Sequence, residues 1–251
     1  VVGHVLECGT QACGGNFSGF TTLDPAVLAK PLGFPIAEVA ADGSGVITKQ
    51  DGTGGAVTVD TVSAQLFYEI QGPEYLGPDV TTHLDTIRLS EDGPDRVRIS
   101  GVRGSTAPET LKVCVNDFGG WRNTVEFVLT GLDIEAKEQW LRAQLEAAWS
   151  AGRRPATVAW SRGPKPAEDP ATIEEAATLL RCTVLDSDAT VAGKGFTAPA
   201  VELALASYPG LTLTAPPAPA TPYGIYRPEY VDRTQVTQRV VHADGREEVI
   251  A

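Results

Sequence analysis

Groups able to do chemistry gather first in residues 6–20, LECGTQACGGNFSGF. The stretch holds two thiols, two amides and a double glycine, at Cys8, Cys13, Gln11, Asn16, Gly14 and Gly15. A thiol can act as a nucleophile, an amide both donates and accepts hydrogen bonds, and glycine lets a backbone turn sharply or approach a ligand. Two interpretations stay open: a strand ending in a glycine turn beside a polar pocket, or a tight turn around buried thiols.

A second glycine-rich stretch, residues 52–55 (GTGG), precedes residues 56–70, which contain no glycine or proline. We expect the second half of this segment to be helical, with Asp60 or Thr61 as its cap. A glycine loop before a helix can hold phosphate or carboxylate, because free amides and the helix dipole both point at the anion. No lysine follows as in a P-loop, so a nucleoside triphosphate is not predicted and an ordinary glycine loop is the favoured interpretation.

Residues 116–123 (NDFGGWRN) connect two predicted strands and carry Asn116, Asp117 and Arg122 around another double glycine. Loops supported by a rigid sheet are common places for binding and catalytic residues. The segment is therefore the second place where side chains directed at a ligand are expected.

Lys194 lies between two glycines, shortly before a predicted helix at residues 199–207. A lysine on a flexible loop before a helix can clamp a phosphate or a carboxylate. It can equally be a solvated loop residue, and the sequence slightly favours that interpretation.

The elements that must position these groups are predicted from periodicity and turn residues. The predicted strands are residues 1–7, 36–40, 45–49, 85–89, 96–102, 111–115, 124–129 and 156–160, and the predicted main helices are residues 133–150, 172–180 and 199–207, with a short helical segment at 24–30. Strands outnumber helices and come in hairpins, which predicts an α+β fold with a mixed, mostly antiparallel sheet and about three helices; an α/β fold is the alternative. We expect residues 1–215 to form one domain, followed by a proline- and tyrosine-rich arm with a terminal hairpin at 216–251.

Composition excludes several classes of protein. The formal charge of −12 over 251 residues argues against general nucleic-acid binding. No apolar run approaches the ~20 residues that a membrane span needs, and four cysteines do not make a disulfide framework, so a cytoplasmic protein is expected. There is no methionine, which predicts that the chain is a fragment, a processed product or a piece of a larger protein.

Four stretches, in order, resemble the acyclic terpene utilisation family of bacteria: residues 6–20, 52–80, 111–123 and 200–210. The resemblance implies that the chain is the second half of a larger domain whose upstream half precedes it. It also implies a role in breaking down citronellol- and geraniol-type isoprenoids, by a pathway that runs through branched acyl-CoA thioesters. It supplies no catalytic mechanism.

An enzyme acting on an acyl-CoA thioester, of lyase or hydratase type, needs anion contacts, an oxyanion hole and an acid or base. The predicted catalytic residues are Cys8, Asn16, Asn116 and Asp117, and the predicted substrate contacts are Gln11, Gly14, Gly15, Gly52, Thr53, Gly54, Gly55, Arg122 and Lys194. The thioester is expected as substrate, with no separate cofactor and no metal, and the protein is expected to be a homo-oligomer.

Other classes fit less well. No GxSxG elbow is present, only three histidines occur, and the spacing of His4, Cys8 and Cys13 is loose for zinc. A dinucleotide-binding pattern is not visible either. The remaining alternative is a non-catalytic scaffold or assembly partner of the pathway enzymes, for which an aromatic, proline-rich arm would be suited.

Overall fold

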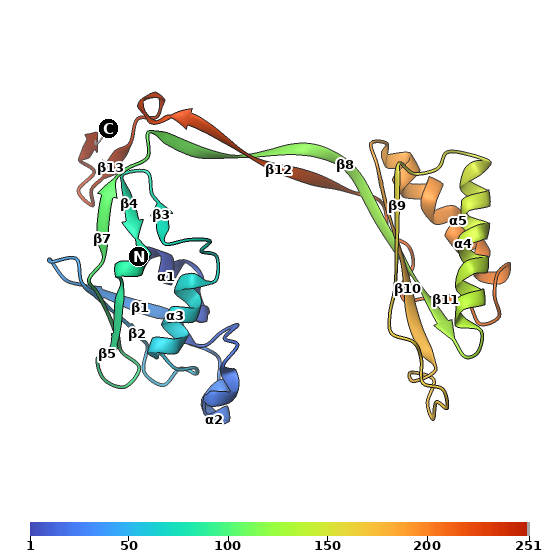
Figure 1. Cartoon of the computed structure of the whole chain (residues 1–251), viewed down its shortest axis with the longest axis horizontal. Helices are drawn as coiled ribbons and strands as arrows, with labels where there is room; N and C mark the ends of the chain where they lie inside the picture. Colours follow the sequence, from blue (N-terminus) through green and yellow to red (C-terminus); the bar gives the residue numbers. More distant parts are fainter. Residues whose placement is uncertain (250–251) are drawn as a thin grey trace. The chain divides into compact units, whose positions relative to one another are not determined.

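The computed structural model describes residues 1–249 and contains two compact units, one formed by residues 1–112 and 230–249 and the other by residues 113–229 (Figure 1). Helices and antiparallel strands are mixed in both. The α+β prediction is therefore confirmed.

The first unit is built on a four-stranded antiparallel sheet with the strand order β1-β2-β6-β5. Its strands are β1 (Pro35–Val39), β2 (Gly45–Lys49), β5 (Arg88–Glu91) and β6 (Val97–Ser100). Both hairpins expected from the sequence are present, with β1 paired to β2 and β5 to β6. Smaller sheets consist of β3 (Glu74–Leu76), β4 (Val80–His83) and β7 (Arg103–Thr106), and of β13 (Arg239–Val241) and β14 (Glu247–Val249), which form the expected terminal hairpin.

Helices and short helical turns accompany this sheet, and most of them lie in the first 67 residues. They are α1 (Val2–Glu7), α2 (Pro25–Leu28), α3 (Val59–Phe67) and short 3-10 turns at Gly9–Cys13, Phe20–Thr22, Leu84–Thr86 and Arg233–Gln235. The strand predicted for residues 1–7 is wrong. Its β-branched residues favour a strand locally, but Val5 is fully buried in a core shared with α3 and β2, and tertiary packing overrides the propensity.

The second unit is organised around β8 (Thr110–Thr130), the central strand of a sheet with the order β11-β8-β10-β9, to which β12 also pairs. The other strands are β9 (Thr157–Arg162), β10 (Ala177–Asp186), β11 (Thr212–Leu213) and β12 (Thr221–Asp232). The two strands and loop predicted for residues 111–129 are thus one strand. Gly120, at φ +121°, passes against the Asp186 carbonyl where a Cβ would collide, so its glycine serves close approach and not a loop.

Two helices and a π-helical turn complete this unit: α4 (Ile134–Ser150), α5 (Phe196–Glu202) and the turn Val191–Gly195, followed by a 3-10 turn at Leu203–Leu205. The prediction of α4 is confirmed, and its Leu141, Leu145 and Trp149 are buried. The helix predicted for residues 172–180 is wrong, because Leu180, Cys182 and Val184 of β10 face the core at the two-residue period of a strand.

Candidate functional site

The glycine turn near the start of the chain is tightly packed. Gly14 ends a 3-10 turn with φ +100°, and the Gly15 amide donates to the Thr10 carbonyl at 3.0 Å. Cys13 is fully buried, and burial raises the pKa of its thiol to about 11. Of the two interpretations of this stretch, the tight turn with a buried thiol describes Cys13; the preceding segment is a helix and not the end of a strand.

Residues 52–55 lie against this turn, and their amides are used within the chain. The amide of Gly54 donates to Pro31 at 2.8 Å and that of Gly55 to Val27 at 3.0 Å. The next amide, that of Ala56, donates to the Cys13 carbonyl at 3.1 Å. The two glycine-rich stretches predicted as substrate contacts are therefore brought together, but their hydrogen bonds run to the backbone.

The N-terminus of α3 is occupied by carboxylates of the chain itself. Asp95 accepts a hydrogen bond from the Val57 amide at 2.9 Å, and Glu91 accepts one from the Val59 amide at 3.0 Å. Lys49, whose side chain is only 7% exposed, pairs with Asp95 at 3.2 Å. The helix is capped by Thr58, reciprocally with Thr61, and not by Asp60 or Thr61 as predicted. The dipole of α3 is thus already neutralised by internal anions.

Cys8 belongs to a cluster of aromatic and titratable side chains that sequence reasoning missed. Its thiol is hydrogen-bonded to the Tyr68 hydroxyl, and this bond raises the pKa of Tyr68. The His4 ring stacks on Tyr68, with centroids 6.5 Å apart, and lies 5.7 Å from Tyr75. The only signal in the sequence is the helical spacing of His4 and Cys8, because the two tyrosines are distant along the chain.

The other candidates of the first unit lie on the turns that follow Cys8, and the backbone amide of Gln11 donates to the Cys8 carbonyl at 3.3 Å. Asn16 is exposed in the left-handed region, at φ +53°, and Gln11 is half-buried in the 3-10 turn. Among the described residues, no three His, Cys, Asp or Glu side chains converge as metal ligands would.

Asn116 and Asp117 lie on exposed positions of β8, in strand and not in a loop. Because neighbouring residues of a strand point to opposite faces, their side chains do not converge. Asp117 accepts a hydrogen bond from Arg227 of β12 at 2.7 Å.

Arg122, also on β8, lines an open pocket of about 520 Å³. Polar walls come from β8, β10 and the segment after β11, and residues 215–218 complete the rim. Across the pocket, Arg181 pairs with Glu126 at 2.6 Å, and its hydrogen bond lowers the pKa of that carboxyl.

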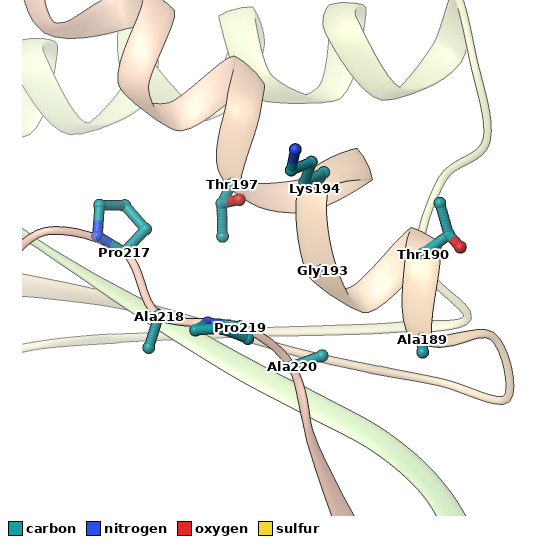
Figure 2. Close-up of a pocket in the computed structure, with 9 residues that line it drawn as sticks. All are labelled: Ala189, Thr190, Gly193, Lys194, Thr197, Pro217, Ala218, Pro219 and Ala220. Atoms are coloured by element: carbon teal, nitrogen blue, oxygen red, sulfur yellow. The ribbon is translucent and has the colours of Figure 1, made fainter.

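Lys194 lines a second pocket of about 480 Å³, between the π-helical turn and residues 217–220. Figure 2 shows the lysine rising from the turn beside Thr197, with Pro217 to Ala220 crossing on the other side. The flexible glycine loop predicted here is wrong: Gly193 is buried within the turn. Pro217 and Ala218 line both pockets, so the Lys194 and Arg122 pockets adjoin.

These two cations differ from their neighbours. Residues 113–229, all of which the structure describes, contain ten lysines and arginines. Eight of them hydrogen-bond or pair with another group, namely Lys137, Arg142, Arg153, Arg154, Arg162, Lys165, Arg181 and Arg227. Only Arg122 and Lys194 have no such partner in this unit, and each lines one of the adjoining pockets.

Asp186, a buried carboxylate at the end of β10, supports the turn that carries Lys194. It accepts hydrogen bonds from the Asp188 amide at 2.8 Å and the Ala156 amide at 3.0 Å, and pairs with Arg153 at 3.0 Å. Burial raises the pKa of Asp186, but these donors outweigh burial and the pKa lies below its ordinary value. Sequence reasoning missed this residue, which has no local motif.

The family model for acyclic terpene utilisation proteins (AtuA) matches residues 1–242 of the chain. The chain belongs to this family. No curated protein and no solved structure was found to match it. Within residues 1–249, no helix is long and apolar enough to cross a membrane.

For this member of the acyclic terpene utilisation family, the candidate residues divide between the two units. Cys8, Gln11, Asn16 and the two glycine-rich stretches belong to the first, and Asn116, Asp117, Arg122 and Lys194 to the second. In the second, two predicted contacts, Arg122 and Lys194, line pockets and carry unpaired positive charge, which can bind an anion.

Proposed function

We propose that the chain acts in the breakdown of citronellol- and geraniol-type isoprenoids by binding a branched acyl-CoA thioester, as a lyase- or hydratase-type enzyme. The observation that supports this substrate class is the pair of adjoining pockets lined by Lys194 and Arg122, the two cations of residues 113–229 that have no partner among the described residues. Coenzyme A carries several phosphates, and charge-assisted hydrogen bonds to phosphate are strong.

The two cations would contribute differently. The planar guanidinium of Arg122 can bind a phosphate with two parallel hydrogen bonds, whereas the Lys194 ammonium acts as a point charge. Thr190 and Thr197 of the Lys194 pocket add hydroxyl groups, and Pro217 to Ala220 offer apolar surface to the remainder of the ligand.

The chemical step needs an acid or base at the α or β carbon of the acyl group. Cys8, Asn16, Asn116 and Asp117 remain the proposed catalytic residues. Asn116 and Asp117 belong to the same unit as the pockets and are therefore the first to substitute in a turnover assay.

The test is titration calorimetry and native mass spectrometry of the protein with citronellyl-CoA and geranyl-CoA. Lys194→Gln and Arg122→Gln should each weaken binding about 10-fold, the effect of losing one charge-assisted contact of roughly 1.4 kcal/mol. Lys165→Gln is the matched control, because Lys165 is a lysine of the same unit that lines neither pocket and should leave affinity unchanged. Absence of thioester binding by the wild type, or equal weakening by the control, would contradict the proposal.

The alternative is a scaffold for the pathway enzymes, favoured by exposed apolar side chains on β8 and β12 such as Phe118 and Ile225, 64% and 53% exposed. The two functions separate in one comparison. An enzyme requires Lys194 and Arg122 for turnover while assembly is retained, whereas a scaffold binds pathway enzymes equally well without either charge.

A further inference from the structure

The segment between β11 and β12, residues 215–220 (APPAPA), lies between the two adjoining pockets, and we call it the pocket wall. Before it, β11 pairs with residues 127 and 128 of β8, and after it β12 pairs with β8 again. Three residues of the wall are prolines, which have no amide to donate to a neighbouring strand. The ladder of backbone hydrogen bonds along this edge of β8 is therefore interrupted at the wall.

The side chain of Asn123 spans this interruption. Asn123 is a buried polar residue of β8, only 7% exposed, and strand alternation places it on the same face as the buried Val125 and Phe127. Its Nδ2 donates a hydrogen bond to the Ala218 carbonyl at 2.9 Å, and its Oδ1 accepts one from the Thr124 amide at 2.8 Å. One side-chain amide thus supplies a donor to the wall and an acceptor to β8.

Asn123 lines neither pocket, whereas the residues that it bonds line them. Ala218 lines both pockets and Thr124 lines the Arg122 pocket. Figure 2 shows the wall crossing the Lys194 pocket opposite the turn, and a Cβ at Gly193 would lie 4.0 Å from that of Ala220. A displacement of Ala218 would therefore change both pockets at once.

We propose that Asn123 is a positioning residue, whose side-chain amide holds the pocket wall at the distance from β8 that shapes the Arg122 pocket and the Lys194 pocket. An apolar residue of similar size would leave the Ala218 carbonyl and the Thr124 amide without their buried partner, which is unfavourable. The position of the wall can be measured without a ligand. The effect of Asn123 on thioester affinity, by contrast, rests on the proposed function.

Two substitutions separate the hydrogen bonds of Asn123 from its volume. Asn123→Leu has a similar size and removes both bonds. Asn123→Asp keeps an acceptor for the Thr124 amide, but its ionised carboxylate has no hydrogen to donate to the Ala218 carbonyl. When this carboxyl group is protonated, it can donate again. Because burial raises the pKa of a carboxyl group, we expect the wall contact to recover between about pH 8 and about pH 5.5 in Asn123→Asp alone.

NMR spectra of the full chain with isotope-labelled alanine methyl groups measure the position of the wall. At about pH 8, the signals of Ala218 and Ala220 should shift in both variants, while that of Ala200, which is fully buried in the core, should stay. At about pH 5.5, the two wall signals should return toward their wild-type positions in Asn123→Asp and not in Asn123→Leu. Comparing the two variants at each pH removes the titration of other groups.

Tyr208→Phe is the matched control. It also removes a buried side-chain hydrogen bond to β8, that of the Tyr208 hydroxyl to the Val128 carbonyl at 2.9 Å, but Tyr208 does not contact the wall through it. The wall signals should not change. In a parallel titration with geranyl-CoA, both Asn123 variants should bind about 10-fold more weakly than the wild type at about pH 8, and Tyr208→Phe should bind equally well.

Wall signals that stay at their wild-type positions in both Asn123 variants would overturn the proposal, and so would an equal shift in Tyr208→Phe. If Asn123→Leu does not fold, Asn123→Asp decides alone, because a shift that does not recover in acid contradicts the role of the donor. A wild type that binds no thioester while the wall signals respond as expected would refute the proposed substrate and still support the positioning role of Asn123.

Discussion

In residues 1–112, the polar backbone of the glycine-rich stretches is satisfied by the chain itself, whereas in residues 113–229 two cations beside pockets are left without a partner. The amides of Gly54 and Gly55 donate to carbonyls, and the N-terminus of α3 binds Glu91 and Asp95. Lys194 and Arg122 instead face open space. The difference teaches that a glycine-rich stretch can indicate close packing as well as ligand binding. An unpaired positive charge is therefore the better indicator of an anion-binding site.

Among the substitutions that test this difference between the two units, Gly55→Ala is expected to change stability most. The Gly55 φ of +75° disfavours any side chain, and a Cβ would collide with the Cys13 carbonyl. Gly55→Ala should lower the free energy of unfolding by at least about 3 kcal/mol, measured by urea denaturation. Gly52→Ala is the control: its φ is +79° but nothing lies within 4 Å, so only the backbone penalty of about 1 kcal/mol is expected.

Equal losses in the two glycine variants would contradict a packing role for Gly55. Loss of ligand binding by folded Gly52→Ala would instead restore the anion-binding interpretation of residues 52–55.

A smaller effect is expected at Asp186 in the other unit. Asp186→Asn replaces an acceptor of two amides and Arg153 by a neutral amide, and should cost about 2 kcal/mol in urea denaturation. Because the pKa of Asp186 is lowered in the folded state, the wild type has this stabilisation above the ordinary pKa of aspartate and loses it as pH falls through the lowered pKa. The difference between wild type and variant should therefore shrink in acid; a constant difference would contradict the role of the ionised carboxylate.

The stability contribution of Cys13 depends on pH in the opposite direction to that of Asp186: it is lost at high pH and not in acid. Burial raises the pKa of its thiol from 9.0 to about 11, so its stabilising contribution is complete below pH 9 and is lost as pH rises toward 11. Between these values the wild type should lose on the order of 1 kcal/mol per pH unit relative to Cys13→Ala. Burial also raises the pKa of the Cys182 thiol, but Cys182 is present in both proteins. Its contribution therefore cancels when the urea midpoints of the wild type and Cys13→Ala are compared. Parallel pH profiles would show that Cys13 is accessible to solvent.

Local signals predicted part of the fold. The hairpin of β1 and β2 was predicted by its turn residues, and α4 by an apolar stripe with the period of a helix. The wrong predictions share one cause, which is that partners distant in sequence decide the outcome. Residues 116–123 have loop composition, yet pairing with β12 and, from residue 121 on, with β10 holds them in β8. The segment α1 is helical because Val5 packs with α3.

The candidate site divides in the same way. Arg122 and Lys194 could be named from the sequence because a cation near glycines is a local feature. Their position in adjoining pockets could not be predicted, because residues 217 and 218, which line both pockets, are distant in sequence. Their lack of a partner could not be predicted either, because it depends on where every nearby acidic group lies. The amides of Gly54 and Gly55 could not be excluded as anion contacts from the sequence, because their acceptors, Pro31 and Val27, lie after and within α2, more than twenty residues away along the chain.

The smallest effect on stability is expected at Lys194 itself, and it separates a binding lysine from a structural one. An unpaired, solvated ammonium contributes little to folding, so Lys194→Gln should change the free energy of unfolding by less than about 0.5 kcal/mol. Thermal shift should then differ between the proteins only when a thioester is added, since a ligand that binds the folded state stabilises it by RT ln(1 + [L]/Kd), which falls as Kd rises. A Lys194→Gln variant that is destabilised without ligand would place the lysine with the internally used groups of residues 1–112, and would remove the contrast between the two units.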